Sequence, residues 1–230
     1  LNSTPMSSSI FLLLLTTSFS NLNSGIPNVS RPPISSYLSY TTLLTPDLVK
    51  MSAHAIPAGA HIIHFHNGLL VSDSLENMPV GISTHLVDED DLNAVVDLAP
   101  ADHPVTDLSV AAMTSGLSLD VASGATVKNP IILTFTGNSR SVSTHPVVLL
   151  RVGEGAQASI AEWHNASVGL SAPLMAIDIA DNARLDYVKI QQDGATTTHL
   201  AATGIKMGEA AVLDGFQLSI GACLARLEAH

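Results

Sequence analysis

The chain has 230 residues, of which 46% are hydrophobic, and this is enough apolar material to build a substantial core. A formal net charge of -11, without any stripe of Lys and Arg, argues against nucleic acid or an anionic membrane as the main ligand. The single cysteine, Cys223, excludes an internal disulfide framework and any cysteine-rich zinc or iron–sulfur site built from this chain alone.

Residues 1–48 differ in composition from the rest of the chain, because Ser, Thr, Asn and Pro predominate and Arg31 is the only charged residue before position 47. The run IFLLLL in this segment is far shorter than the roughly 20 apolar residues of a membrane-spanning helix. A secretion signal and a plastid transit peptide are two further interpretations, although basic residues are scarce for both. We predict that residues 1–48 are a low-complexity extension, either disordered or mis-assigned.

Residues 49–118 are predicted to form a small mixed, acidic region, since ten acidic residues and no Lys or Arg lie between Asp73 and Asp120. The region opens with HIIHFHNGLL, which contains His61, His64 and His66. In a strand the second and third histidines share a face and the first lies opposite, so at most two could bind one metal ion. The pattern predicts a strand with incidental histidines before an Asn-Gly turn, and a metal site here is the alternative hypothesis.

Residues 119–230 contain a repeat. Three segments share one frame, in which an apolar residue, an acid and an alanine recur at fixed offsets: RVGEGAQASIAEW (151–163), DIADNARLDYVKI (178–190) and KMGEAAVLDGFQL (206–218). The alanines, Ala156, Ala183 and Ala211, are 27 and 28 residues apart. Apolar positions alternate within each copy, which is the period of a strand and leaves no room for a crossover helix. The repeat therefore predicts an all-β fold, a parallel β-helix built as a solenoid of about 27-residue units.

The same frame explains a false dinucleotide-binding motif. Residues 153–158 match G-x-G-x-x-A after a strand, but the next copy places Ala180 and Asn182 at the two glycine positions. The glycines are therefore interpreted as turn residues. There is no nucleophile elbow, P-loop or H-E-x-x-H motif. Glu162 and His164 are predicted to share a strand face, and His164 and His199 are interpreted as isolated turn or strand-surface residues.

Four segments carry a resemblance to a known family: FHNGLLVSDSLENMPVGI (65–82), LSLDVASGATVKNPIILTF (117–135), HPVVLLRVGEGAQASIAEWHNA (145–166) and ADNARLDYVKIQQDGATTTHLA (180–201). They resemble the amino-terminal half of the core of the SufB/SufD family of iron–sulfur cluster assembly proteins, and the first segment resembles its SufD branch. The resemblance implies a right-handed parallel β-helix and a non-enzymatic scaffold subunit. It also implies that this chain is a fragment, truncated on its carboxy-terminal side.

The partners implied by the resemblance are SufB-like and SufC-like subunits of a SufBCD complex, which assembles iron–sulfur clusters and supports iron entry. The complex handles the cluster, and we expect no cofactor bound by this chain alone. No catalytic, cofactor-binding or metal-binding residue of the family can be assigned to a position in this sequence. The expected location is the cytoplasm, or the plastid stroma if the source is a plant or alga.

Two other functions remain as alternatives to the scaffold. One is a secreted β-helical protein that binds or degrades polysaccharide, for which the acids Asp178, Asp181 and Asp186 are candidates. The simpler interpretation of these acids is that they mark solvated turn edges. The other alternative is a small metal-binding β-domain centred on the histidines of residues 61–66.

Overall fold

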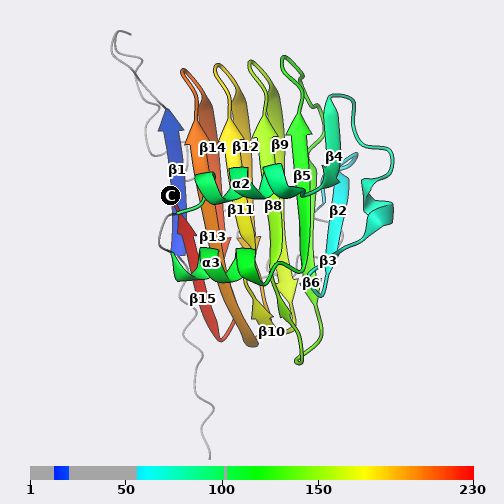
Figure 1. Cartoon of the computed structure of the whole chain (residues 1–230), viewed down its shortest axis with the longest axis vertical. Helices are drawn as coiled ribbons and strands as arrows, with labels where there is room; N and C mark the ends of the chain where they lie inside the picture. The colour runs from blue at the N-terminus through cyan, green and yellow to red at the C-terminus, as the bar shows by residue number, and fades with distance from the viewer. Residues whose placement is uncertain (1–12, 21–55, 101–102) are drawn as a thin grey trace, which may run out of the picture.

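The computed structural model describes residues 13–20, 56–100 and 103–230, and within them most of the chain forms two β-sheets that face each other (Figure 1). We name them sheet A and sheet B. Sheet A contains, in spatial order, β1 (Leu13–Ser20), β14 (Val212–Ser219), β12 (Arg184–Gln191), β9 (Gln157–Ala166), β6 (Ile131–Gly137), β2 (His61–His66) and β3 (Leu69–Leu70). Sheet B contains β4 (Ile82–Leu86), β5 (Ser115–Val121), β8 (Pro146–Val152), β11 (Leu174–Ile179), β13 (Thr196–Met207), β10 (Val168–Ser171) and β7 (Ser143–Thr144), with β15 (Leu224–Ala229) paired to β13. Of the sequence segment 1–48, only β1 lies within the described residues.

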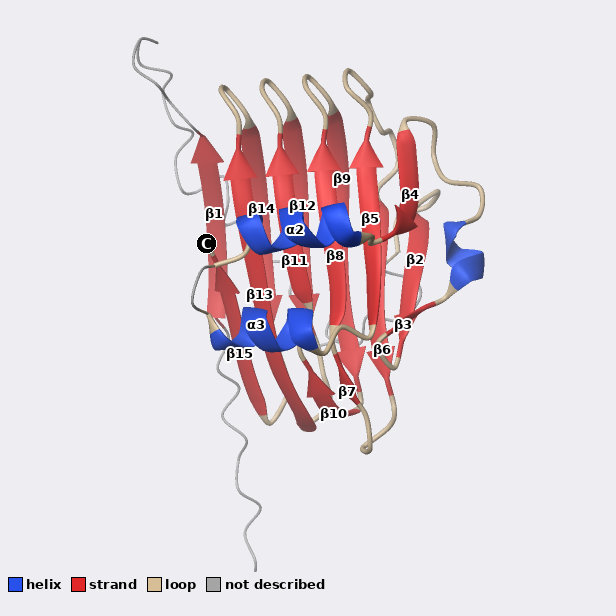
Figure 2. Cartoon of the chain, viewed as in Figure 1, coloured by secondary structure: helices blue, strands red, loops and turns tan. Residues whose placement is uncertain are grey.

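The central strands of both sheets pair in parallel and their register follows the sequence repeat (Figure 2). Ile160 of β9 lies beside Tyr187 of β12, 27 residues later, and Tyr187 lies beside Gly215 of β14, 28 residues later. Each turn of the chain therefore adds one strand to each sheet. The predicted parallel β-solenoid is confirmed.

The repeated alanines close the tight turns between the two sheets. The N–H of Ala156 donates to the carbonyl of Gly153 at 3.0 Å, and Ala183 and Ala211 make the equivalent bond in the next two copies. The residue before each alanine has a positive φ, from +55° to +65°. Each alanine is buried, so a larger side chain would have no space at this position. The structure confirms that the glycines of the false dinucleotide motif are turn residues.

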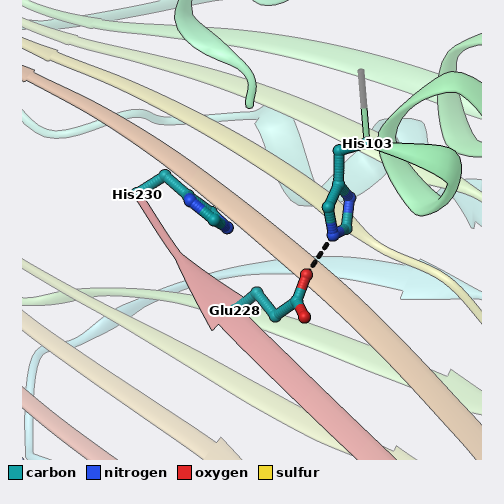
Figure 3. A group of neighbouring side chains, drawn as sticks. All are labelled: His103, Glu228 and His230. Carbon is teal, nitrogen blue, oxygen red and sulfur yellow. Dashed lines mark ion pairs between the residues drawn. The ribbon is translucent and has the colours of Figure 1, made fainter. Parts of the chain in front are cut away.

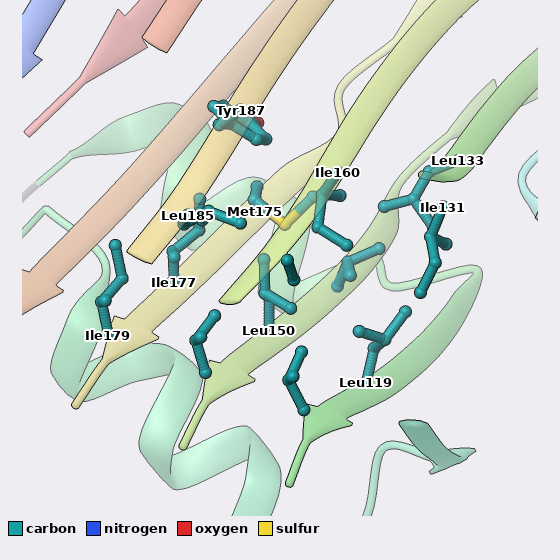
Figure 4. Packing of buried hydrophobic residues seen from close by; sticks show 14 of the residues in the cluster. Leu119, Ile131, Leu133, Leu150, Ile160, Met175, Ile177, Ile179, Leu185 and Tyr187 are labelled. Atoms are coloured by element: carbon teal, nitrogen blue, oxygen red, sulfur yellow. The ribbon is translucent and has the colours of Figure 1, made fainter. Parts of the chain in front are cut away.

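The main core fills the space between the two sheets (Figure 4). Alternate residues of each strand point inward, as a strand period requires. Figure 4 labels ten of its members: Leu119, Ile131, Leu133, Leu150, Ile160, Met175, Ile177, Ile179, Leu185 and Tyr187. Because successive rungs stack the same kinds of side chain, each rung buries its inner face on its neighbours.

Two helices, α2 (Glu89–Leu98) and α3 (Pro104–Ala111), lie across the outer face of sheet B (Figure 1), and a short 3-10 helix, η4 (Ser72–Leu75), precedes them. Asp88 caps α2 by accepting a hydrogen bond from the N–H of Asp91 at 2.9 Å. Val95 of α2 packs on a second apolar cluster with Leu149 and Leu174 of the sheet. Sheet B is thus buried on both faces, which explains the continuous apolar run PVVLL in β8. None of the helices that the structure describes is long and apolar enough to cross a membrane.

Gly204 of β13 allows the end of α2 to approach the sheet. A Cβ atom at this position would lie 2.1 Å from the carbonyl oxygen of Leu98, a backbone atom that cannot move independently of the helix. We expect Gly204→Ala to lower the free energy of unfolding by about 1–3 kcal/mol, measured by urea denaturation. Gly137→Ala is the matched control, because its Cβ would meet only ordinary contacts at 3.4 Å and beyond. Equal stability of the two variants would contradict this account of the helix–sheet contact.

Candidate functional site

The inward face of the solenoid changes from apolar to polar along the strands. On β9 the inward residues Ala158 and Ile160 are followed by Glu162 and His164, and β12 changes in the same way. The polar residues converge from β9, β12 and β13 and the loop after β12. We name this set the interior polar cluster: Glu162, His164, Lys189, Gln191, Asp193, Thr197, His199 and Thr203, all of which are at most 4% exposed.

Glu162 is the charged centre of one half of the cluster. Its Oε2 atom lies 2.7 Å from Nε2 of His164 and 3.3 Å from Nζ of Lys189. The lysine also donates a hydrogen bond to Oγ1 of Thr203 at 3.1 Å. Burial alone would raise the pKa of Glu162, but the Lys189 ammonium and the His164 contact lower this pKa to about 2. The carboxylate and ammonium therefore form a buried ion pair at neutral pH.

Asp193 anchors the other half. Its Oδ2 atom accepts a hydrogen bond from Nε2 of Gln191 at 2.8 Å and lies 2.8 Å from Nδ1 of His199. Its Oδ1 atom accepts from the backbone N–H of Ala166 at 2.6 Å. Burial raises the pKa of Asp193, but the contacts with His199 and Gln191 and the charge of His164 together lower it below its usual value. The ionised aspartate thus accepts contacts from residues of three strands, β9, β12 and β13.

His164 and His199 connect the two halves. The ring of His164 stacks on Phe135 with a centroid separation of 4.5 Å and meets the ring of His199 edge-on at 4.9 Å. Burial lowers the pKa of His164 to about 4, so this ring is neutral at pH 7. Nδ1 of His164, Nε2 of His199 and Oε1 of Glu162 make no hydrogen bond to any residue in the described ranges. The cluster therefore has free nitrogen and oxygen atoms that can hold or pass a proton in an enclosed space.

The sequence prediction for these residues is partly right. Glu162 and His164 share a strand face, as expected. The interpretation of His164 and His199 as isolated turn or surface residues is wrong, because both are fully buried and their rings touch. The alternation that begins at Ala158 could have placed His164 inside. The contact with His199 could not be predicted in this way, because it depends on where β13 lies relative to β9 in the folded chain.

The three histidines of β2 lie as the strand period predicts. His64 and His66 share a face, and their rings stack with centroids 6.1 Å apart. Nδ1 of His64 lies 2.7 Å from Oγ1 of Thr134, whereas Nε2 of His61 contacts the carbonyl of Ser74 at 3.0 Å. The strand ends in the predicted Asn-Gly turn, with φ of +49° and +80° at residues 67 and 68. Only two of these histidines therefore face the same side.

Two groups of three candidate metal ligands occur elsewhere in the described part of the chain, and neither was identified from the sequence. The first contains His85, Asp88 and Asp91. Its members already serve the fold, because Asp88 caps α2 and Asp91 pairs with Nη2 of Arg151 at 2.6 Å. The second contains His103, Glu228 and His230, which lie where α3 begins above sheet B.

Comparison with known proteins finds a family model that is similar to part of the solenoid. Residues 135–230 match the family model described as "SUF system FeS cluster assembly, SufBD core domain". A search of curated proteins finds no match. The matched segment begins in β6 and includes the parallel strands from β8 onward and the whole interior polar cluster. The match supports the SufB/SufD family for this part of the chain and a role in iron–sulfur cluster assembly.

Proposed function

We propose that this protein is a SufD-like scaffold subunit of a SufBCD-type complex that assembles iron–sulfur clusters and supports iron entry. The observation that carries the proposal is the SufBD core match over the parallel rungs, together with the SufD-like segment at residues 65–82. The partners are a SufB-like and a SufC-like subunit, and the cluster is the cargo of the complex. The corresponding location is the cytoplasm, or the plastid stroma in a plant or alga.

The burial of the polar groups supports a non-catalytic role. The carboxylates and histidines of the interior polar cluster are enclosed between the sheets, where only a small species such as a proton or water can reach them. A catalytic site needs reactive groups that touch the substrate. The outer face of sheet A has a groove of about 360 Å³ whose lining includes Ile132, Trp163 and Val188, and an apolar surface of this kind is suited to a protein partner.

The three carboxylates that are candidates for a polysaccharide site all have partners within the solenoid. Oδ1 of Asp181 accepts the N–H of Glu209 at 2.7 Å and so holds a turn together. Asp178 pairs with Lys206 at 3.7 Å, and Asp186 pairs with Arg184 at 2.8 Å. Each of the three acids therefore has a partner within the solenoid, which favours the scaffold over the polysaccharide alternative.

The test is assembly with purified partners. We expect the chain to co-purify with tagged SufB-like and SufC-like subunits and to elute with them as one species in size-exclusion chromatography with light scattering. An unrelated β-solenoid of similar net charge is the control and should elute separately. Elution of the chain apart from both partners would contradict the proposal. If the chain instead replaces the SufB-like subunit, the SufD assignment is wrong although the family role stands.

A further inference from the structure

A second group of chemically reactive side chains lies on the outside of the solenoid, at the edge of sheet B (Figure 3). Glu228 lies in β15, and His230 follows two residues later, so the two side chains share a strand face. His103 reaches them from the position that caps α3. Figure 3 shows all three side chains directed toward a common point. Residues more than 120 positions apart in sequence thus form one cluster.

The backbone around each of these residues is held by hydrogen bonds. The N–H of His230 donates to the carbonyl of Thr203 at 3.0 Å, and its own carbonyl accepts from Ile205 at 2.9 Å, so the parallel ladder continues past β15. On the helix side, Nδ1 of His103 accepts from the N–H of Thr106 at 3.4 Å, and Pro104 occupies the first turn of α3. The convergence of the side chains is therefore built on two regular elements.

The geometry of the cluster suits a metal ion. One ligand atom from each residue lies within 4.8 Å of the other two, and the rings of His103 and His230 are 5.8 Å apart. Oε2 of Glu228 contacts Nε2 of His103 and makes no hydrogen bond of normal geometry to a described residue. Two ligands of a tetrahedral zinc ion lie roughly 3.3 Å apart, given bond lengths of about 2 Å. Rotation of the exposed His230 side chain can bring its ligand atom closer to the other two, from the present limit of 4.8 Å toward this separation.

We propose that His103, Glu228 and His230 bind a divalent transition-metal ion of the Zn²⁺ or Fe²⁺ class. Two imidazoles and one carboxylate favour these ions over Mg²⁺ and Ca²⁺, which prefer oxygen ligands alone. Three protein ligands leave at least one coordination position open, as in catalytic or transfer sites and unlike closed structural zinc sites. The site lies outside the solenoid, and the inference does not depend on the function proposed above.

Neighbouring residues provide the second layer of contacts that metal ligands need. Nε of Arg226 donates to Oε1 of Glu228 at 2.5 Å, which fixes the carboxylate and leaves Oε2 for the metal. Nδ1 of His103 lies 3.4 Å from the backbone nitrogen of Thr106 and 3.4 Å from its Oγ1 atom, and these contacts orient the imidazole ring.

Metal titration of the purified, metal-free chain tests this inference. We expect Co²⁺ to bind with one-to-one stoichiometry, to give visible absorption bands of a low-coordinate nitrogen and oxygen site, and to be displaced by Zn²⁺. His103→Gln and His230→Gln should each weaken Co²⁺ binding at least tenfold. His64→Gln/His66→Gln is the matched control, because it removes two histidines that share a face elsewhere, and it should leave the affinity unchanged.

Each other outcome would overturn the proposal. Absence of one-to-one binding, or binding that is lost in the His64/His66 control, would assign no metal to this cluster. Co²⁺ binding that is unchanged in His230→Gln would also show that the metal is not bound by this cluster. This variant is informative because His230 is exposed and its replacement should leave the fold intact. Far-ultraviolet circular dichroism of every variant verifies that an affinity change is not caused by unfolding.

Discussion

Replacement of Lys189 by methionine is expected to lower the free energy of unfolding by about 3–5 kcal/mol, because it leaves the Glu162 carboxylate buried without its ammonium partner. Methionine is unbranched and only one atom shorter than lysine, so the loss reports mainly the charge and not a cavity. Thr203 also loses its hydrogen-bond donor in this variant. Urea denaturation at pH 7 measures the difference.

Two further variants test the physical cause. Lys206→Met removes an exposed lysine of the same solenoid, 3.7 Å from Asp178, and should change the free energy of unfolding by less than about 1 kcal/mol. The double variant Glu162→Leu/Lys189→Met removes both charges of the buried pair and should recover at least half of the stability lost in the single variant. Additive losses in the double variant would show that the two residues do not act as a pair.

The stability of the protein is expected to decrease on acidification from pH 6.5 to pH 4, by about 3 kcal/mol from His164 alone. Burial lowers the pKa of this histidine from 6.5 to about 4 in the folded chain. Between these two values the unfolded chain binds the proton and the folded chain does not, so acid favours unfolding. Below pH 4.5 Glu162 adds a second loss, because its folded pKa of about 2 lies below its unfolded value.

Urea denaturation at pH 7, 6, 5 and 4 measures this dependence. His164→Gln removes the titrating group and should flatten the stability curve between pH 6.5 and 4. A residual slope of the same sign is expected, because burial also lowers the pKa of His145. His230→Gln replaces an exposed histidine far from the interior polar cluster in sequence and should retain the wild-type slope. An identical slope in His164→Gln and wild type would contradict the assignment of the pH dependence to His164.

The repeat could be predicted because its signal is local. Ala156, Ala183 and Ala211 mark turns that depend only on a few neighbouring residues, and the strand period on either side follows from alternation. Their spacing then determines the register, because a parallel solenoid pairs equivalent positions of successive rungs. The fold class of the solenoid therefore follows from the sequence.

The sequence did not predict the interior polar cluster or the group at His103, because both depend on contacts between residues that are far apart in the chain. His164 meets His199 across the interior, and His103 meets Glu228 across more than 120 positions of the chain. Within the interior cluster, Glu162 and Lys189 occupy the inward position that Leu133 fills on β6. A polar residue on a predicted inward face is the signal that would have located the interior polar cluster.

The antiparallel strand at one end of sheet A restricts what can join the solenoid there. β14 uses one of its edges for β12 and the other for β1, in a register that runs from Leu13 beside Ser219 to Ser20 beside Val212. Each strand edge offers its N–H and C=O groups to only one neighbour. A strand that pairs directly with this edge of β14, whether a further parallel rung or a strand from a partner, must therefore displace β1. Direct pairing of such a strand with β14 and retention of β1 are mutually exclusive, so β1 competes for this edge.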